Sequence, residues 1–157
     1  MISGKNFQKG CTKLVLNGKT NDDLSVISAL VQDAVLLKKN IRWIKARHRF
    51  TLLLNRFQWE LIEEKIDESV TFGRSKSALI FDGVIKVFSL GIEKTLQDGV
   101  LSLLSLDFKS DKDTKEIELI FSGGCAIKLH VEYLHVMLKD LEMSNSKGKT
   151  MIPKHDI

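Results

Sequence analysis

Short apolar segments with a period of two constrain the fold of this chain more than any other feature. From residue 34 onward the sequence reads "AVLLK", "IRWIKA", "RFTLLLN", "SALIF", "VIKVFSL", "EIELIF" and "CAIKLHV", with turn pairs such as Asp82-Gly83 and Asp98-Gly99 between segments. The spacings leave no room for crossover helices, which argues against parallel strands. We therefore expect a mostly antiparallel sheet of seven or eight strands, strongly curved or closed into a barrel.

Two segments show the period of an amphipathic helix instead. Thr20 precedes "NDDLSVISALVQDA" with Asp23 three residues later, which predicts a capped early helix. The segment "VEYLHVMLKDLE" predicts a C-terminal helix with an apolar stripe of Val131, Leu134, Leu138 and Leu141. The expected fold is therefore α+β, with an element order similar to that of pleckstrin-homology-like domains, an analogy that names no ligand.

One domain accounts for most of the chain. A length of 157 residues suits a single core, which we assign to residues 12–142. Residues 1–11 and 143–157 have no apolar periodicity, so we expect a flexible N-terminus and a flexible C-terminal tail. The acidic stretch "ELIEEKIDES" is compatible with a helical turn or with a loop.

Composition argues against several classes of protein. No apolar run exceeds four residues and no secretory signal is present, so we expect a cytoplasmic protein that does not span a membrane. Cys11 and Cys125 form neither a disulfide framework nor a zinc motif. The net charge of +4 comes from the two ends of the chain, whose lysines far outnumber their acids. A body close to neutral argues against non-specific nucleic-acid binding.

Motifs of catalysis are also missing from the sequence. There is no G-x-S-x-G, H-E-x-x-H or Walker pattern, and the Gly123-Gly124 pair lies between two strands, as a hairpin turn would. His130 and His135 have no carboxylate or cysteine at a ligand spacing. We expect no enzymatic activity, no metal and no cofactor.

Arginines interleaved with aromatic residues mark the candidate binding region, residues 41–59. Such a pattern suits stacking on bases and pairing with phosphate, and it suits protein interfaces equally well. The near-neutral body favours an interaction module for an unknown protein partner or for self-association. The alternative is a nucleic-acid or phospholigand binder that uses the same stretch. The candidate binding residues are Arg42, Trp43, Arg47, Arg49, Arg56 and Trp59.

Within this region, "RFTLLLNRFQWE" contains a conflict of phase. Alternation that places Phe50, Leu52 and Leu54 inward would also place Arg56 inward and Phe57 outward. A bulge or strand end at Asn55-Arg56 would resolve the conflict. Under this interpretation Phe57 and Trp59 join the core, and Arg56 lies at the sheet edge beside the following acids. The competing interpretation leaves both aromatic residues on an open face.

The strings "NRFQWE", "GVLSLLSLDF" and "FSGGCAIKLHVEYLHVMLKDL" resemble a family of uncharacterised bacterial proteins of about this length, a domain of unknown function. The Asn-Arg-Phe-x-Trp-Glu and Gly-Gly-x-x-Ile strings carry most of the resemblance, which covers residues 12–142. It implies a bacterial cytosolic protein with one compact domain, and it implies no activity. The acidic stretch after Trp59 departs from the more basic stretch of those relatives, which weakens a phosphate-binding role.

Overall fold

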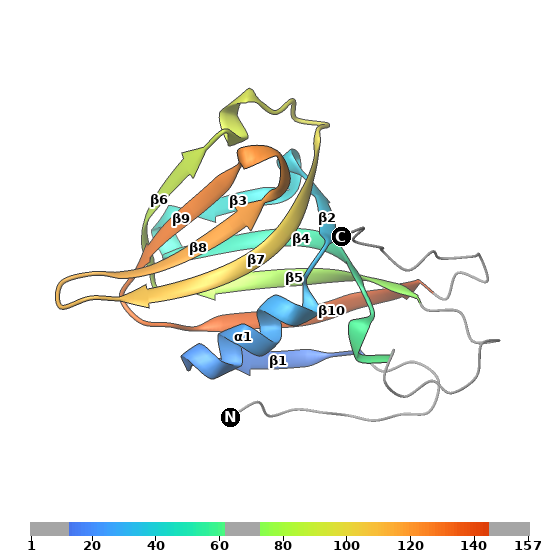
Figure 1. Ribbon diagram of the computed structural model, residues 1–157, viewed down its shortest axis with the longest axis horizontal. Helices are drawn as coiled ribbons and strands as arrows, with labels where there is room; N and C mark the ends of the chain where they lie inside the picture. Colours follow the sequence, from blue (N-terminus) through green and yellow to red (C-terminus); the bar gives the residue numbers. More distant parts are fainter. Residues whose placement is uncertain (1–12, 62–72, 145–157) are drawn as a thin grey trace.

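One antiparallel sheet contains every strand of the computed structural model, which describes residues 13–61 and 73–144 (Figure 1). The strands are β1 Val15–Gly18, β2 Ala34–Leu37, β3 Ile41–Ile44, β4 Arg49–Phe57, β5 Arg74–Asp82, β6 Val84–Leu90, β7 Val100–Ser110, β8 Lys115–Phe121, β9 Ala126–Val131 and β10 Val136–Ser144. Their order in the sheet is β1-β10-β5-β4-β2-β7-β8-β9-β6, and β3 pairs with β4 beside β2. The α-helix α1 spans Asn21–Leu30, and the 3-10 helices are η1 Lys38–Asn40, η2 Lys45–Arg47, η3 Trp59–Leu61, η4 Ile92–Lys94 and η5 Ser122–Gly124.

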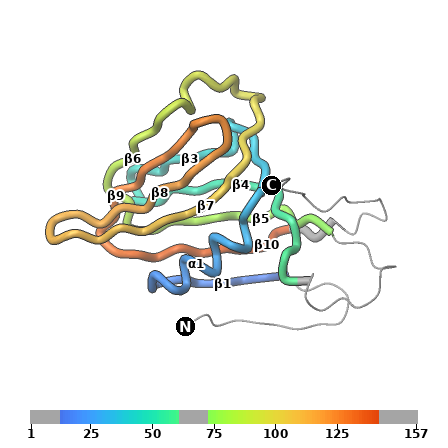
Figure 2. The backbone as a smooth tube through the Cα atoms, in the orientation of Figure 1, coloured from blue at the N-terminus to red at the C-terminus, as the bar shows by residue number. Residues whose placement is uncertain are grey.

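The sheet bends around its own core, which replaces the second layer that a flat sheet would need (Figure 2). On β4, alternation directs Phe50, Leu52 and Leu54 inward, and all three are buried. On β8 and β9 the same alternation buries Ile117 and Leu129. The opposite face of the sheet, here called the outer face, carries most of the polar side chains of these strands.

Helix α1 contributes the rest of the core and packs against β1 and β7. It begins with the predicted capping box: the Asp23 N–H donates to Thr20 Oγ1 (3.1 Å) and the Thr20 N–H donates to Asp23 Oδ2 (3.2 Å). The Lys19 N–H, which donates to the same carboxylate, and further hydrogen bonds from Thr20 lower the pKa of Asp23 to about 2, although burial opposes the shift. Leu24 and Ile27 are buried between the helix and the sheet.

The prediction of an antiparallel, curved, single-domain sheet is confirmed, and two details of it were wrong. The described residues form ten strands instead of seven or eight, and one α-helix instead of two. The expected C-terminal helix is strand β10, which pairs on both sides, with β1 and with β5. Val136 and Leu138 are buried by period-two alternation. Without that helix the likeness to pleckstrin-homology-like domains is not confirmed.

Three predictions concern segments outside the described residues. These are the flexible N-terminus of residues 1–11, nearly all of the C-terminal tail of residues 143–157, and most of the acidic stretch, at residues 62–69. Helix α1 has ten residues, and no helix in the two described ranges is long and apolar enough to cross a membrane.

Candidate functional site

The structure does not bring the predicted Arg and Trp residues together on one surface. Arg42 on β3 and Arg47 on η2 are exposed and close in sequence to the turn between β3 and β4. Arg49 forms an ion pair with Asp82 of the neighbouring β5 (Nε to Oδ1, 2.8 Å). Trp43 points inward, because it pairs with the buried Phe50, and it packs against the core. Arg42 and Arg47 thus remain as exposed cations of this turn.

Arg56 lies inside the protein, and the expectation that it sits at the sheet edge was wrong. The β4–β5 register runs through Asn55, Arg56 and Phe57 without a shift, so no bulge interrupts the alternation. The Arg56 side chain is 0% exposed. Its Nε and Nη2 atoms donate to Oδ1 (2.9 Å) and Oδ2 (2.8 Å) of Asp140 on β10. This bidentate pairing with a carboxylate offsets the cost of burying the arginine charge.

The remaining polar atoms of this buried network are also partnered. The Ser77 hydroxyl donates to Asp140 Oδ1 (2.6 Å), and the Leu14 N–H donates to Asp140 Oδ2 (2.9 Å). Arg56 Nη1 donates to Glu60 Oε2 (2.8 Å). The network therefore joins β4, β5, β10 and the segment that leads into β1. Its donors and acceptors are already used, so it is suited to hold strands together and poorly suited to bind a ligand.

The two buried charges stabilise each other. Burial alone would raise the pKa of Asp140, but the hydrogen bonds and charge of Arg56, with Ser77 and the Leu14 N–H, outweigh it and lower that pKa. Burial likewise opposes the charge of Arg56, yet its hydrogen bonds to Asp140 and Glu60 raise the Arg56 pKa. Both groups are charged in the folded protein at neutral pH.

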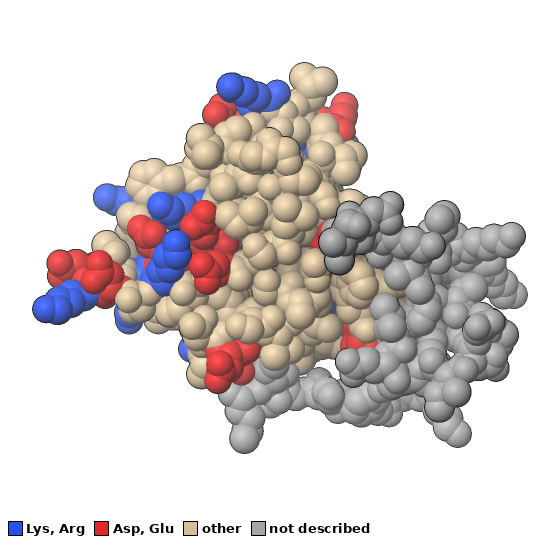
Figure 3. Space-filling view, in the orientation of Figure 1, with Lys and Arg blue, Asp and Glu red and all other residues tan. Residues whose placement is uncertain are grey.

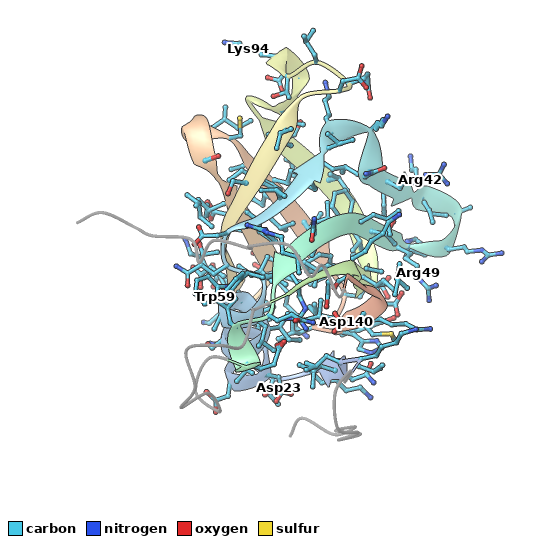
Figure 4. All side chains as sticks on the ribbon, turned by 90° about the vertical axis from the view of Figure 1, so that its right-hand side faces the viewer. Asp23, Arg42, Arg49, Trp59, Lys94 and Asp140 are labelled. Atoms are coloured by element: carbon cyan, nitrogen blue, oxygen red, sulfur yellow. The ribbon has the colours of Figure 1, made fainter. Side chains whose placement is uncertain are left out.

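Phe57 and Trp59 have different environments. Phe57 is fully buried, as predicted, although the chain reaches this position without a bulge. Trp59 is half-buried on η3, where its indole N–H donates to the Gln32 carbonyl (2.8 Å) and its ring meets Phe57 edge to face at 4.8 Å. Trp59 and Arg42 lie on opposite sides of the view in Figure 4, so they do not form one surface.

The turn that carries the exposed cations is held in a defined conformation. His48 closes it with a left-handed backbone (φ 52°, ψ 41°). The Val84 N–H, at the start of β6, donates to the His48 carbonyl (2.9 Å), and His48 Nδ1 lies 3.2 Å from the Val84 carbonyl oxygen. The β3–β4 turn is therefore attached to the beginning of β6.

Strand β6 is the second feature that stands out, because it ends the sheet. Among the described residues it pairs only with β9. Its sequence, VIKVFSL, has five apolar residues in seven and a single charge. The register with β9 places Lys86, Phe88 and Leu90 on the outer face, where Phe88 is 50% and Leu90 66% exposed.

An open groove of about 410 Å³ runs along the outer face between β6, β9 and β8. Three of its polar lining residues pair with one another: His130 Nε2 lies 2.9 Å from Glu116 Oε1, and Lys128 Nζ lies 3.8 Å from Glu116 Oε2. Phe88 packs against the His130 ring with centroids 4.9 Å apart. Figure 3 shows charges of both signs intermixed over β8 and β9, so this surface has no field of one sign.

The groove provides a contact surface, and its described residues form neither a catalytic group nor a metal site. Ser89 lines it, but no hydrogen bond within the described structure joins Ser89 to His130, as a nucleophile and its base would require. In the same residues no three His, Cys, Asp or Glu side chains come together so that they could hold a metal ion. The apolar wall of Phe88 and Leu90 remains the exposed part of the groove.

The outer-face residues of β6 were not among the predicted binding residues. The sequence does contain an indication of them. VIKVFSL has apolar residues on both faces of the strand, as in strands that are covered on both faces. Asp140 was not predicted either, because it lies outside the apolar stripe expected for a helix at residues 131–142.

Comparison with protein families gives one result that covers most of the chain. A family model described as a protein of unknown function, DUF2948, matches residues 14–155. Neither the comparison with curated proteins nor that with solved structures gives a match. The match agrees with the resemblance carried by the Asn-Arg-Phe-x-Trp-Glu string, and the chain belongs to the DUF2948 family of proteins of unknown function.

Proposed function

We propose that the protein is a non-enzymatic interaction module that binds an extended segment of a partner protein along the open edge of β6. The observation that carries the proposal is the composition of this edge. Natural sheets protect their edge strands with short length, charged residues, proline or bulges. Strand β6 has seven residues, one lysine and no proline, and its bulge lies at its first residues, between Val84 and Lys86.

An added strand would match what β6 presents. Backbone N–H and C=O groups on its open side would pair with the partner segment, which is a common mode of peptide recognition. The partner's side chains would cover Phe88 and Leu90 and extend into the groove beside them. Burying apolar surface of this kind contributes roughly 25 cal/mol for each Å² removed from water.

The alternative, a nucleic-acid or phospholigand binder, has less support. Of the residues predicted for it, Arg42 and Arg47 are exposed and without an acidic partner in the described residues, whereas Arg49 is paired with Asp82. Arg56 is buried with Asp140, and Trp59 lies on another side of the molecule. Two arginines without an aromatic platform are a weak basis for nucleic-acid recognition.

A cross-linking experiment in the native cell tests the proposal. The photoreactive amino acid benzoylphenylalanine replaces Phe88 in one variant and Tyr133 in the other, because both positions are aromatic and similarly exposed, at 50% and 48%. We expect position 88, and not position 133, to give a discrete cross-linked product with a second protein. The purified complex should also show slowed amide exchange along β6.

A second variant separates binding from folding. Replacing Phe88 and Leu90 by alanine removes exposed side chains, so thermal unfolding should change little while the complex is lost. Equal cross-linking from positions 88 and 133, or a complex in which the amides of β6 exchange as fast as in the free protein, would contradict the proposal.

A further inference from the structure

Hydrogen bonds connect the segments on either side of β3 to the segments on either side of β6. Among the described residues β3 pairs only with β4, so each of the two strands has one unpaired side. The hydrogen bonds between His48 and Val84 join the turn that follows β3 to the start of β6. At the other end, the Lys38 N–H donates to Gly99 O (3.1 Å) and Lys38 Nζ donates to Thr95 O (2.8 Å), in the connection between β6 and β7.

Positive charge is concentrated beside these edges. Residues 34–59 contain seven Lys and Arg and no Asp or Glu. Three of the seven cations form ion pairs with acids elsewhere in the chain, and these are Lys39, Arg49 and Arg56. The cations at β3, η2 and β6 that have no acidic partner in the described residues are Arg42, Lys45, Arg47 and Lys86. No acid belongs to any of these three elements, so a partner segment with negative charge fits this place.

Successive side chains of β3 and β6 point alternately to the outer face and to the inside. On the outer face they present Arg42 and Lys86, whereas Trp43 and Val87 point to the inside and pack against the core. A strand added to β6 on the side of β3 would alternate in the same way. Its outward side chains would meet Arg42 and Lys86 and, further along β6, Phe88 and Leu90, and its inward side chains would meet Trp43 and Val87.

From this geometry we infer that the segment bound at β6 is an acidic β-strand of a partner protein, with acidic residues alternating with apolar ones. The inference rests on the proposed function and names the chemistry of its ligand. Arg42 and Lys86 attract and orient the acidic side chains, and the turn residues Lys45 and Arg47 extend the attraction past one end of the strand. Backbone pairing with β6 and the apolar positions supply the rest of the affinity.

Defined peptides test the inference without knowledge of the partner. The probe is a blocked peptide of alternating glutamate and valine, about eight residues long, a common strand length. Its controls are the same peptide with lysine for glutamate and a single-stranded oligodeoxynucleotide of similar charge. In a Trp59→Phe background Trp43 is the remaining tryptophan, so its fluorescence should shift to shorter wavelength on binding. We expect a response to the glutamate peptide alone, with amide protection along β6 and β3.

Charge reversal provides the matched control. Arg42→Glu with Lys86→Glu should weaken binding of the glutamate peptide at low salt by at least about tenfold, or 1.4 kcal/mol, and should create affinity for the lysine peptide. Lys19→Glu with Lys112→Glu changes the net charge equally, at exposed positions in connections between other elements, and should leave binding unchanged. Circular dichroism verifies that all variants are folded.

Each result decides the inference. Binding of the lysine peptide as strong as that of the glutamate peptide overturns the acidic ligand, and preferential binding of the oligonucleotide replaces it with nucleic acid. No binding of any probe also overturns it. In all three cases the proposed function is judged separately, by cross-linking from position 88 and amide exchange along β6, which make no assumption about the charge of the partner.

Discussion

Replacement of Asp140 by asparagine should destabilise the fold far more than an ordinary polar substitution. The change keeps the size of the side chain and removes its charge, so it creates no cavity. Arg56 then remains 0% exposed with one acidic partner, Glu60, whose own side chain is 24% exposed. Removing one member of a buried ion pair costs about 3–5 kcal/mol, because the other charge stays in a poor solvent.

The four hydrogen bonds that Asp140 accepts support this magnitude. Arg56 provides two of them, and Ser77 and the Leu14 N–H provide one each. An asparagine amide group cannot accept at the position of its nitrogen, so at least one of these donors loses its partner. An unsatisfied buried donor costs a further ~1–3 kcal/mol, part of which the previous figure already contains. The expected loss is a large share of the ~5–15 kcal/mol that stabilises a typical domain.

Urea unfolding at several pH values measures the effect and its cause. Because the pKa of Asp140 is lowered in the folded state, its contribution is complete above the unfolded pKa of about 4 and is lost as the pH falls through the folded pKa. The difference between wild type and Asp140→Asn should therefore be constant from about pH 5 to 7 and should shrink in stronger acid. A loss below ~1 kcal/mol at pH 7, or a difference that does not change in acid, would refute the reasoning. The double variant Arg56→Met, Asp140→Leu should be more stable than either single variant, since it leaves no unpaired buried charge from the pair.

Two smaller changes test local geometry. Gly83→Ala should lower the unfolding free energy by ~1–3 kcal/mol, since Gly83 has φ +73° and an added Cβ would lie 2.8 Å from Cζ of Tyr133. In urea unfolding, adding Tyr133→Ala should recover part of this loss. No recovery would mean that backbone strain alone is responsible. Trp59→Phe should lower the unfolding free energy by ~0.5–1.5 kcal/mol, because the hydrogen bond to Gln32 is lost while the ring contact with Phe57 is retained; a loss above ~3 kcal/mol would place Trp59 in the core.

Much of the sheet could be predicted from sequence, because its strands follow local rules. Alternation in "RFTLLLN" and "EIELIF" identifies strands β4 and β8, and Asp82-Gly83 marks the turn between β5 and β6. The capping box of Thr20 and Asp23 identifies helix α1. In each case the residues that decide the structure are neighbours in the chain.

The two main errors have one common cause. Arg56 and Asp140 are polar residues at inward positions, and each interrupts the apolar alternation of its own strand. In β4 the inward arginine led to the prediction of a bulge. In β10 the inward aspartate broke the period-two pattern of a strand, so the helical spacing of Leu134 and Leu138 was the more regular of the two patterns. Each residue is stable at its inward position only because it pairs with the other, 84 positions away in the chain. No local pattern contains that information.

The candidate site was predictable only in part, for a similar reason. The exposed turn with Arg42 and Arg47 lies within the predicted region. Lys86, Phe88 and Leu90 were missed, because the position of β6 at the end of the sheet follows from the pairing order of all strands. Whether a strand is an edge is a property of the topology and cannot be read from its own residues.

The position of β10 between β1 and β5 has a consequence for synthesis on the ribosome. Strand β1 emerges early, yet its partner spans Val136–Ser144, so β1 waits unpaired while more than a hundred residues are added. Strand β5 likewise exposes one side until β10 arrives. Closing such long loops slows folding, and unpaired edges in the nascent chain invite wrong associations. We therefore expect the finished sheet to form only after residue 144 has left the exit tunnel, with chaperones shielding β1 and β5 until then.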